Sequence, residues 1–198
     1  EIDGIVCGDD RIYPRTSGNP AHAFAFKMML SDQMAEAKVV NIHWTPSKDG
    51  YLKPRVQIEP VVMGGARIEY ATGFNAKFVH DNRIGVGAIV RIIRSGDVIP
   101  HIVEVVEQAS APGMPTETYA WNPTGVDIVL ENPETDAVVR EKNIAGFFRN
   151  IGVEGLSTGN TRKLIGAGFD TIAKIIRMTQ DDFLSVDGFK ERLSTKIR

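Results

Sequence analysis

Two short glycine turns in the C-terminal part of the chain carry groups that could bind phosphate. They are Val153-Glu154-Gly155-Leu156-Ser157 and Val186-Asp187-Gly188-Phe189-Lys190, about 33 residues apart, and each enters a predicted helix. The N–H groups of such a turn and of a helix N-terminus lack partners within the helix and attract anions. For either turn alone, a structural role in which the glycine only ends a turn between packed helices is an equal alternative. Two turns in tandem favour phosphate binding, and Lys190 would add a contact through charge.

A second set of candidate groups consists of long cations on or beside turns in the middle of the chain. Lys48 and Lys53 flank the turn at Gly50, and Arg91 and Arg94 precede a turn at 95–97. Such side chains can reach phosphates or a groove of a nucleic acid, although a solvated hairpin tip is the alternative for each of them alone. Lys48-Asp49-Gly50 also suggests the nucleophilic lysine motif of nucleotidyltransferases. We reject that interpretation, because the motif has a further residue between its lysine and its aspartate.

No other set of residues forms a convincing catalytic or metal site. The single cysteine, Cys7, excludes an internal disulfide and an all-cysteine zinc site within the chain. The histidines lack the spacing of metal ligands and are predicted to be structural; they are His22, His43, His80 and His101. We therefore predict no metal ligands in this chain.

The elements that would position the cations are short strands separated by glycine-rich turns. The predicted strands are 37–44, 55–63, 67–72, 88–94 and 99–106. Five such strands within about 70 residues favour a small antiparallel barrel, and an OB-fold is the leading candidate. After Glu141 the apolar residues recur at helical spacing, so the glycine turns are expected between helices.

The fold class we predict is multidomain α+β. The predicted domains are two strands in 1–30, an OB-fold in 31–106, an acidic proline-rich linker with at most a small hairpin in 107–141, and an all-α module in 142–198. Basic and acidic residues number 12 and 12 in 1–106, 1 and 7 in 107–141, and 10 and 6 in 142–198. The basic C-terminal module is compatible with nucleic acid, whereas we do not expect the acidic segment to contact DNA.

The bulk properties are those of a soluble protein. The sequence has no apolar run long enough for a membrane span and no signal peptide, so no membrane partner is expected. The chain begins with Glu1 and not with methionine, so we expect it to start inside a longer polypeptide.

Five segments, read in order, give a specific resemblance to NAD-dependent DNA ligases. Residues 1–6, Glu-Ile-Asp-Gly-Ile-Val, resemble the fourth nucleotidyltransferase motif of that family, and 22–27, His-Ala-Phe-Ala-Phe-Lys, resemble the fifth. Residues 50–61, which end in Glu-Pro-Val, and 83–85, Arg-Ile-Gly, resemble segments of the family's OB domain. The most specific match is 94–100, Arg-Ser-Gly-Asp-Val-Ile-Pro. With helix-hairpin-helix units following, the resemblance covers nearly the whole chain except 107–141.

The resemblance implies an enzyme that adenylates a lysine from NAD, transfers AMP to a 5′-phosphate and seals the nick with Mg²⁺. Lys27 would be the lysine of the fifth motif that contacts the nucleotide phosphate, and Asp3 would lie on the strand that lines the adenylate pocket. Lys48 and Arg94 match DNA-facing arginines of the family. The implied partners are nicked double-stranded DNA and an N-terminal adenylation domain or subunit, in the cytoplasm of a bacterial or viral system. Without that upstream part, the chain is expected to bind DNA but not to react with NAD.

The departures from the family pattern leave alternatives open. A lysine that usually follows the fourth motif is replaced by Gly8, and the cysteine-free segment 107–141 stands where a zinc module is expected, so no zinc is predicted. These changes suggest a divergent ligase of a virus or phage. The alternative is a catalytically inactive, ligase-derived DNA-binding module, but retention of Lys27 favours the enzyme. A single-stranded DNA-binding OB protein is a third hypothesis, and the scarcity of aromatic residues in the barrel turns argues against it.

Overall fold

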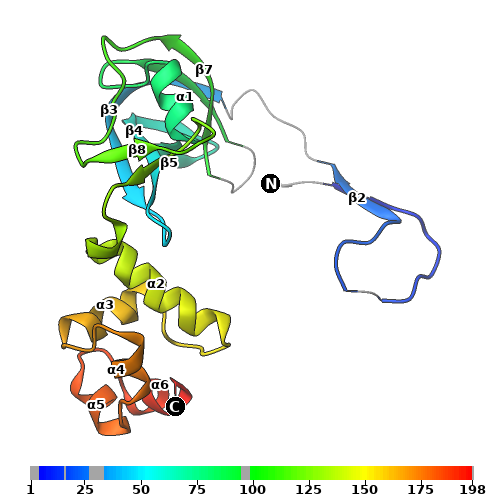
Figure 1. Cartoon of the computed structure of the whole chain (residues 1–198). Coiled ribbons are helices and arrows are strands. Elements are labelled where there is room, and N and C mark those ends of the chain that lie inside the picture. Colours follow the sequence, from blue (N-terminus) through cyan, green and yellow to red (C-terminus); the bar gives the residue numbers. More distant parts are fainter. Residues whose placement is uncertain (1–4, 16, 27–33, 95–98, 198) are drawn as a thin grey trace. The chain divides into compact units, whose positions relative to one another are not determined.

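The chain forms two compact units that are described separately (Figure 1). The computed structural model describes residues 5–15, 17–26, 34–94 and 99–197. The barrel unit comprises Glu1–His43 and Pro54–Pro115, and the helical unit comprises Trp44–Lys53 and Thr116–Arg198. Within the described ranges, no helix is long and apolar enough to cross a membrane.

Five strands of the chain form a closed barrel. They are β3 (Met34–Pro46), β4 (Tyr51–Met63), β5 (Ala66–Thr72), β6 (Ile89–Ile93) and β7 (His101–Glu107). Their order is β3-β6-β7-β5-β4, and an additional pairing of β3 with β4 closes the circuit. Strand β3 pairs with β6, β6 with β7, and β4 with β5 in antiparallel fashion, whereas β5 and β7 are parallel at Thr72 and His101. The small barrel predicted from the turn spacing is confirmed.

Alternation of apolar and polar residues explains which face of each strand enters the barrel. In β4, Val56 and Ile58 are almost completely buried, whereas the intervening Gln57 and the flanking Arg55 point outward. A side-chain period of two in a strand places alternate residues on opposite faces. The core is completed by buried residues of β3 and β6, namely Val39, Val90 and Ile92. The outward positions of β4 are therefore available for surface contacts.

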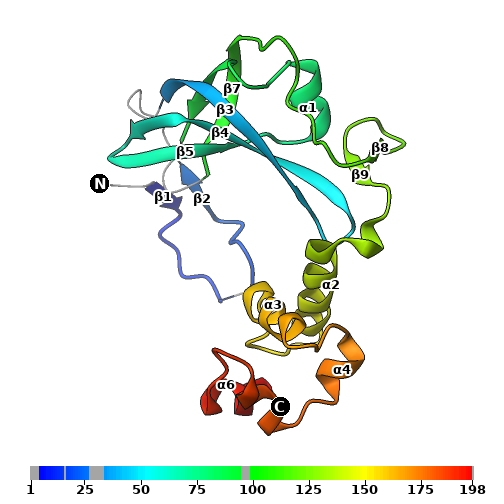
Figure 2. The same ribbon diagram turned by 90° about the vertical axis from the view of Figure 1, so that its left-hand side faces the viewer.

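A short helix, α1 (Ala76–Asp81), lies between β5 and β6 and was not predicted from the sequence. The side chain of Asn75 accepts a hydrogen bond from the N–H of Phe78 at 2.8 Å and so caps the helix. Ala76 and Val79 are completely buried, and α1 lies against the barrel in both views (Figures 1 and 2). Six residues make fewer than two turns, too short a stretch for helical periodicity to be recognised.

The N-terminal region contains a two-stranded antiparallel hairpin of β1 (Ile5–Gly8) and β2 (Ala23–Phe26). Ile5 lies opposite Phe26, and Gly8 lies opposite Ala23. In the connecting loop, Asp9 accepts hydrogen bonds from the N–H of Arg11 and from the hydroxyl of Tyr13. The two strands joined by a loop that were predicted in 1–30 are present.

The C-terminal region is helical. Its helices are α2 (Ala137–Asn150), α3 (Thr158–Gly166), α4 (Ile172–Ile176), α5 (Gln180–Ser185) and α6 (Glu191–Ile197). Helix α3 packs beside α2 (Figures 1 and 2). Helix α2 begins before position 142, where the helical module was predicted to start, because Asp136 caps it by accepting hydrogen bonds from Val138 and Val139.

The segment 107–141 contains more structure than a linker with a hairpin. Strands β8 (Tyr119–Trp121) and β9 (Ile128–Leu130) form an antiparallel hairpin, and η2 (Pro133–Thr135) precedes α2. Strand β9 also pairs with β4, with Ile128 opposite Leu52, and Ile128 is completely buried. At its start, the N–H of Gly113 donates to the carbonyl of Ile84 and ties the segment to the barrel unit.

We predict that Gly50→Ala destabilises the helical unit by about 1–3 kcal/mol, because the new methyl group would overlap its surroundings. Gly50 has φ +81°, and a Cβ there would lie 2.6 Å from the Cβ of Pro133. Denaturant unfolding followed by circular dichroism measures the loss. Gly125→Ala is the matched control, since Gly125 also has positive φ (+67°) but no atom within 4 Å of its Cβ position. Equal losses in the two variants would contradict the predicted overlap with Pro133.

Candidate nucleic-acid interface

The two glycine turns of the helical unit have the same local construction. Gly155 and Gly188 have φ of +95° and +86°, in the left-handed region that glycine adopts without strain. The residues that follow them, Leu156 and Phe189, are both buried, with 4% exposure each. Each turn is thus held by an apolar side chain inserted beneath it and leads into a helix.

The correspondence extends into the helices that follow the turns. Thr161 of α3 and Ser194 of α6 are both completely buried, and they occupy equivalent positions after Gly155 and Gly188. Ser157 caps α3 through its side chain, whereas the equivalent Lys190 accepts hydrogen bonds at its carbonyl from Leu193 and Ser194. This equivalence of buried positions supports the duplicated unit predicted from the two turns.

Each glycine turn packs against the second helix of the other hairpin. A Cβ on Gly155 would lie 2.7 Å from Cδ1 of Leu193, and a Cβ on Gly188 would collide with Nζ of Lys163. Lys196 forms an ion pair with Glu154, and this hydrogen bond lowers the pKa of the Glu154 carboxyl below its ordinary value. The positive φ of both turns favours glycine, and at Gly155 the close approach of Leu193 adds to this preference, whereas the flexible end of Lys163 could move away from a side chain at position 188. The contact of both turns with phosphate stays a prediction.

One apolar core lies beneath both turns. Its buried members are Ile144, Phe148, Leu156, Leu164, Ile175, Met178, Phe183, Val186 and Phe189. Because residues of both turns belong to this cluster, a disturbance in the core would displace both candidate phosphate contacts together.

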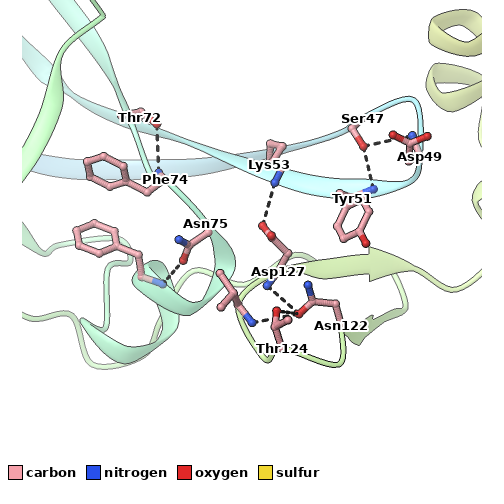
Figure 3. Close-up of polar contacts among 12 residues, drawn as sticks. Ser47, Asp49, Tyr51, Lys53, Thr72, Phe74, Asn75, Asn122, Thr124 and Asp127 are labelled. Atoms are coloured by element: carbon pink, nitrogen blue, oxygen red, sulfur yellow. Dashed lines mark hydrogen bonds and ion pairs between the residues drawn. The ribbon is translucent and has the colours of Figure 1, made fainter.

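Lys48 and Lys53 lie on the β3–β4 hairpin in the helical unit, and Figure 3 shows Lys53 directed toward Asp127. The Ser47 hydroxyl accepts hydrogen bonds from the N–H groups of Asp49 and Tyr51 and shapes the turn. Lys48 pairs with Asp49 at 2.9 Å, and both side chains are more than half exposed; Lys53 pairs with Asp127 at 2.9 Å. The Lys48–Asp49 pair is exposed and contributes little to stability, so Lys48 can exchange Asp49 for a phosphate at small cost. The partner of Lys53 is less accessible, since the Asp127 side chain is only 22% exposed.

Lys48→Ala is expected to weaken binding of nicked duplex DNA and to reduce the slope of log K against log salt concentration by about 0.9, because one phosphate contact would be lost. Fluorescence anisotropy at several salt concentrations measures both quantities. Lys77→Ala removes a comparably exposed lysine of α1 and serves as the control. An unchanged slope for Lys48→Ala would exclude Lys48 from the interface.

The arginines of the second loop differ in their surroundings. Arg91 lies on β6 and forms ion pairs with Glu36 of β3, at 2.6 Å, and with Glu104 of β7. The hydrogen bond with Glu36 is the largest of the causes that raise the pKa of Arg91. Arg91 therefore links three barrel strands, a role that sequence reasoning missed, and its DNA contact stays a prediction. Arg94 follows β6 directly before 95–98, and its DNA contact also stays a prediction.

The predicted catalytic residues, Lys27 and Asp3, lie outside the described residues. Gly8 is exposed at the end of β1, and a Cβ there would meet the Cβ of Ala23 at 3.5 Å, an ordinary contact. The position therefore has room for a Cβ, so close packing does not impose glycine there. Within the part of the chain that is described, no group of three or more His, Cys, Asp or Glu side chains could hold a metal ion.

A cluster on the outer face of the barrel was missed by sequence reasoning. The guanidinium of Arg55 lies 3.9 Å from the ring centroid of Tyr70, and Nε2 of His43 lies 2.7 Å from Oε1 of Gln57. Its signal in the sequence is the outward register of Arg55 and Gln57 on β4. The cluster places a cation and an aromatic ring together, as surfaces that bind nucleic acids often do.

The five-strand barrel with its inserted helix defines an OB-fold protein. Residues 36–113 match the model of the NAD-dependent DNA ligase OB-fold domain. The whole chain is 48% identical to a DNA ligase of Acanthamoeba polyphaga mimivirus, and 97% of it aligns at 30% identity with a DNA ligase of Persephonella marina. The chain belongs to the NAD-dependent DNA ligase family, as its motifs indicated.

The relatives are much longer than this chain. The alignments cover 31% of the mimivirus protein and 29% of the Persephonella marina protein. A homologue in Invertebrate iridescent virus 3 is 35% identical over 194 residues, which are 96% of this chain and 25% of that protein. The chain thus spans about a third or less of these relatives, so the activity of a whole ligase is a proposal here.

Proposed function

We propose that this chain is the part of an NAD-dependent DNA ligase that binds nicked duplex DNA and supports phosphodiester bond formation. The observation that carries the proposal is the match of 36–113 to the ligase OB-fold domain, on residues that fold as a five-strand barrel. The β3–β4 hairpin presents the exposed side chains of Lys48 and Lys53, where phosphate oxygens can compete with the partner carboxylates. The cations position the duplex without reading its sequence.

The helices from α2 to α6 form, in this proposal, a tandem helix-hairpin-helix domain that holds the DNA backbone. The matching positive φ values of Gly155 and Gly188, and the equivalent burial of Thr161 and Ser194, support a duplicated unit. Backbone N–H groups at such turns bind phosphate regardless of base sequence. A nick can occur in any DNA sequence. Contacts that do not depend on base sequence therefore suit a protein that must bind nicks wherever they occur.

The β1–β2 hairpin would be the last part of the adenylation domain. In that arrangement Asp3 lines the adenylate pocket, Lys27 contacts the nucleotide phosphate, and the upstream part supplies the lysine that NAD adenylates. A lysine is a compact positive charge, which suits stabilisation of a phosphoryl group during transfer. Such an enzyme would use Mg²⁺ and serve DNA replication and repair in the cytoplasm of bacterial or virus-infected cells.

Nick sealing on a labelled duplex with NAD and Mg²⁺ tests the proposal. We expect this chain alone to bind the nicked duplex without sealing it, and sealing to appear when the upstream adenylation part is supplied. No binding by the chain, together with no sealing by the assembled protein, would refute the proposal.

A second candidate function is that of a ligase-derived module that binds DNA without catalysis. The observation that favours it is Gly8, which occupies a position with room for a larger side chain but carries no charge. Tight binding of nicked DNA combined with no sealing after addition of the upstream part would support this second function.

A further inference from the structure

Within the described ranges, two residues other than glycine have a backbone φ in the left-handed region. They are Phe74, with φ 58°, and Arg83, with φ 48°. A side chain with a Cβ is disfavoured in this region, and a bulky one is an outlier that asks for an explanation.

The contacts of Arg83 explain its positive φ, whereas the contacts of Phe74 explain its positive φ only in part. The Arg83 side chain donates hydrogen bonds to the carbonyls of Ala109 and Ser110, so it holds the loop that follows β7. The Phe74 ring has a T-shaped contact with Phe78, with centroids 4.9 Å apart, and a more distant one with His101 at 6.2 Å. Despite these contacts, Phe74 is 45% exposed, which is unusual for a large apolar residue at an unfavourable φ.

The loop around Phe74 is fixed from both sides (Figure 3). The Thr72 hydroxyl accepts a hydrogen bond from the N–H of Phe74 at 3.1 Å, and Asn75 caps α1 directly after it. Gly73 donates its N–H to the carbonyl of Pro54, and a Cβ on Gly73 would lie 2.9 Å from the Cβ of Pro54. These contacts fix the backbone of the loop, and the contact with Phe78 restrains the ring.

Polar and cationic residues lie on the two strands next to the loop that carries the ring. Thr72 lies opposite Arg55 in the β4–β5 register, so both side chains are on the same face of the sheet. Arg55 is exposed and stacks on Tyr70. The Phe74 ring, which packs on Phe78 next to a strand that carries Arg55, is much smaller than the broad apolar patch that a protein partner would need. It fits duplex DNA, where phosphates lie beside the sugars and base edges of the minor groove, and where apolar side chains act as wedges.

We propose that Phe74 is a DNA-contacting wedge, whose ring presses against the sugars and base edges of the minor groove of a nicked duplex while Arg55 faces the adjacent phosphates. This inference rests on the proposed function, since it names the residue with which the barrel would distort its DNA. The fixed backbone gives the ring a defined position before DNA binds, so little order is lost on contact.

The test uses the 198-residue chain, its Phe74→Gly and Phe74→Asn variants, and Val62→Ala as a control that trims another exposed apolar residue. Glycine and asparagine tolerate positive φ, so both variants should keep the loop conformation. We expect Phe74→Gly and Phe74→Asn to bind a nicked duplex about tenfold more weakly, with a thermal midpoint that is unchanged or higher. Val62→Ala should bind like the original chain.

A 2-aminopurine base beside the nick reports the wedge directly, and at saturating protein its fluorescence does not depend on affinity. The original chain should increase the fluorescence by unstacking the base, and Phe74→Gly should not. Equal binding and equal fluorescence for the original chain and both variants would overturn the inference while leaving the proposed function intact. If the original chain itself fails to bind nicked DNA, the proposed function fails, and the inference fails with it.

Discussion

Leu164→Ala is expected to destabilise the helical unit by about 2–5 kcal/mol and to weaken the binding of nicked DNA, because it leaves a cavity beneath both glycine turns. Leu164 is completely buried in the cluster that includes Leu156 and Phe189, the residues that follow Gly155 and Gly188. If the core collapsed in part, the two glycine turns would move, and they could no longer contact two phosphates at the same time. Stability and DNA affinity should therefore fall together.

Urea unfolding monitored by helical circular dichroism, and anisotropy with a nicked duplex, measure the two effects. Ile176→Ala is the matched control, since Ile176 also lies on a helix of this unit but is 62% exposed. Its removal should change stability by much less than that of Leu164. A Leu164→Ala protein that is destabilised but binds DNA with unchanged affinity and salt dependence would show that the turns do not hold the backbone.

Lys27→Ala is expected to lower the rate of nick sealing by the assembled enzyme about 100-fold to 1000-fold, while the affinity for nicked DNA changes little. The motif at 22–27 ends in this lysine, and the family resemblance assigns it to the nucleotide phosphate. Removing a fixed positive charge from a group that gains negative charge in the transition state has an effect of this size. The positive charge of Lys27 would stabilise the transition state of sealing and contribute little to DNA affinity.

Single-turnover sealing in the presence of saturating NAD and Mg²⁺ separates chemistry from binding. Lys38→Ala controls for the loss of one positive charge, because Lys38 is an exposed residue of β3 with no role assigned here. If Lys27→Ala mainly reduced DNA affinity and left the single-turnover rate unchanged, the catalytic assignment of Lys27 would be wrong.

Local patterns were sufficient to predict the barrel. The predicted strands 55–63 and 67–72 correspond to β4 and β5, because alternating apolar residues and a glycine turn define a hairpin without reference to the rest of the chain. The same holds for the helices after α2, whose apolar spacing and capping residues are close in sequence. The family motifs, being short and contiguous, could also be read directly, and the comparisons confirmed the resemblance.

Other features depend on residues that are distant in the sequence. The pairing of β9 with β4 gives the segment 107–141 a buried residue, Ile128, which proline content and acidity did not indicate. Arg91 was predicted from its place beside a turn, yet its ion pairs come from Glu36 and Glu104 on neighbouring strands. Such partners are brought together only when the strand order is known.

The family, the barrel, the helical region and the identity of the candidate cations could be predicted from the sequence, because each depends on short contiguous patterns. The tertiary structure decided which of these groups have partners and which backbone positions are constrained. Gly155 must be glycine because Leu193 of a different helix approaches it, and Phe74 is held at positive φ by Thr72 and by the close packing of Gly73 on Pro54. Close packing between distant segments leaves no periodic signal in the sequence, so only the folded chain reveals it.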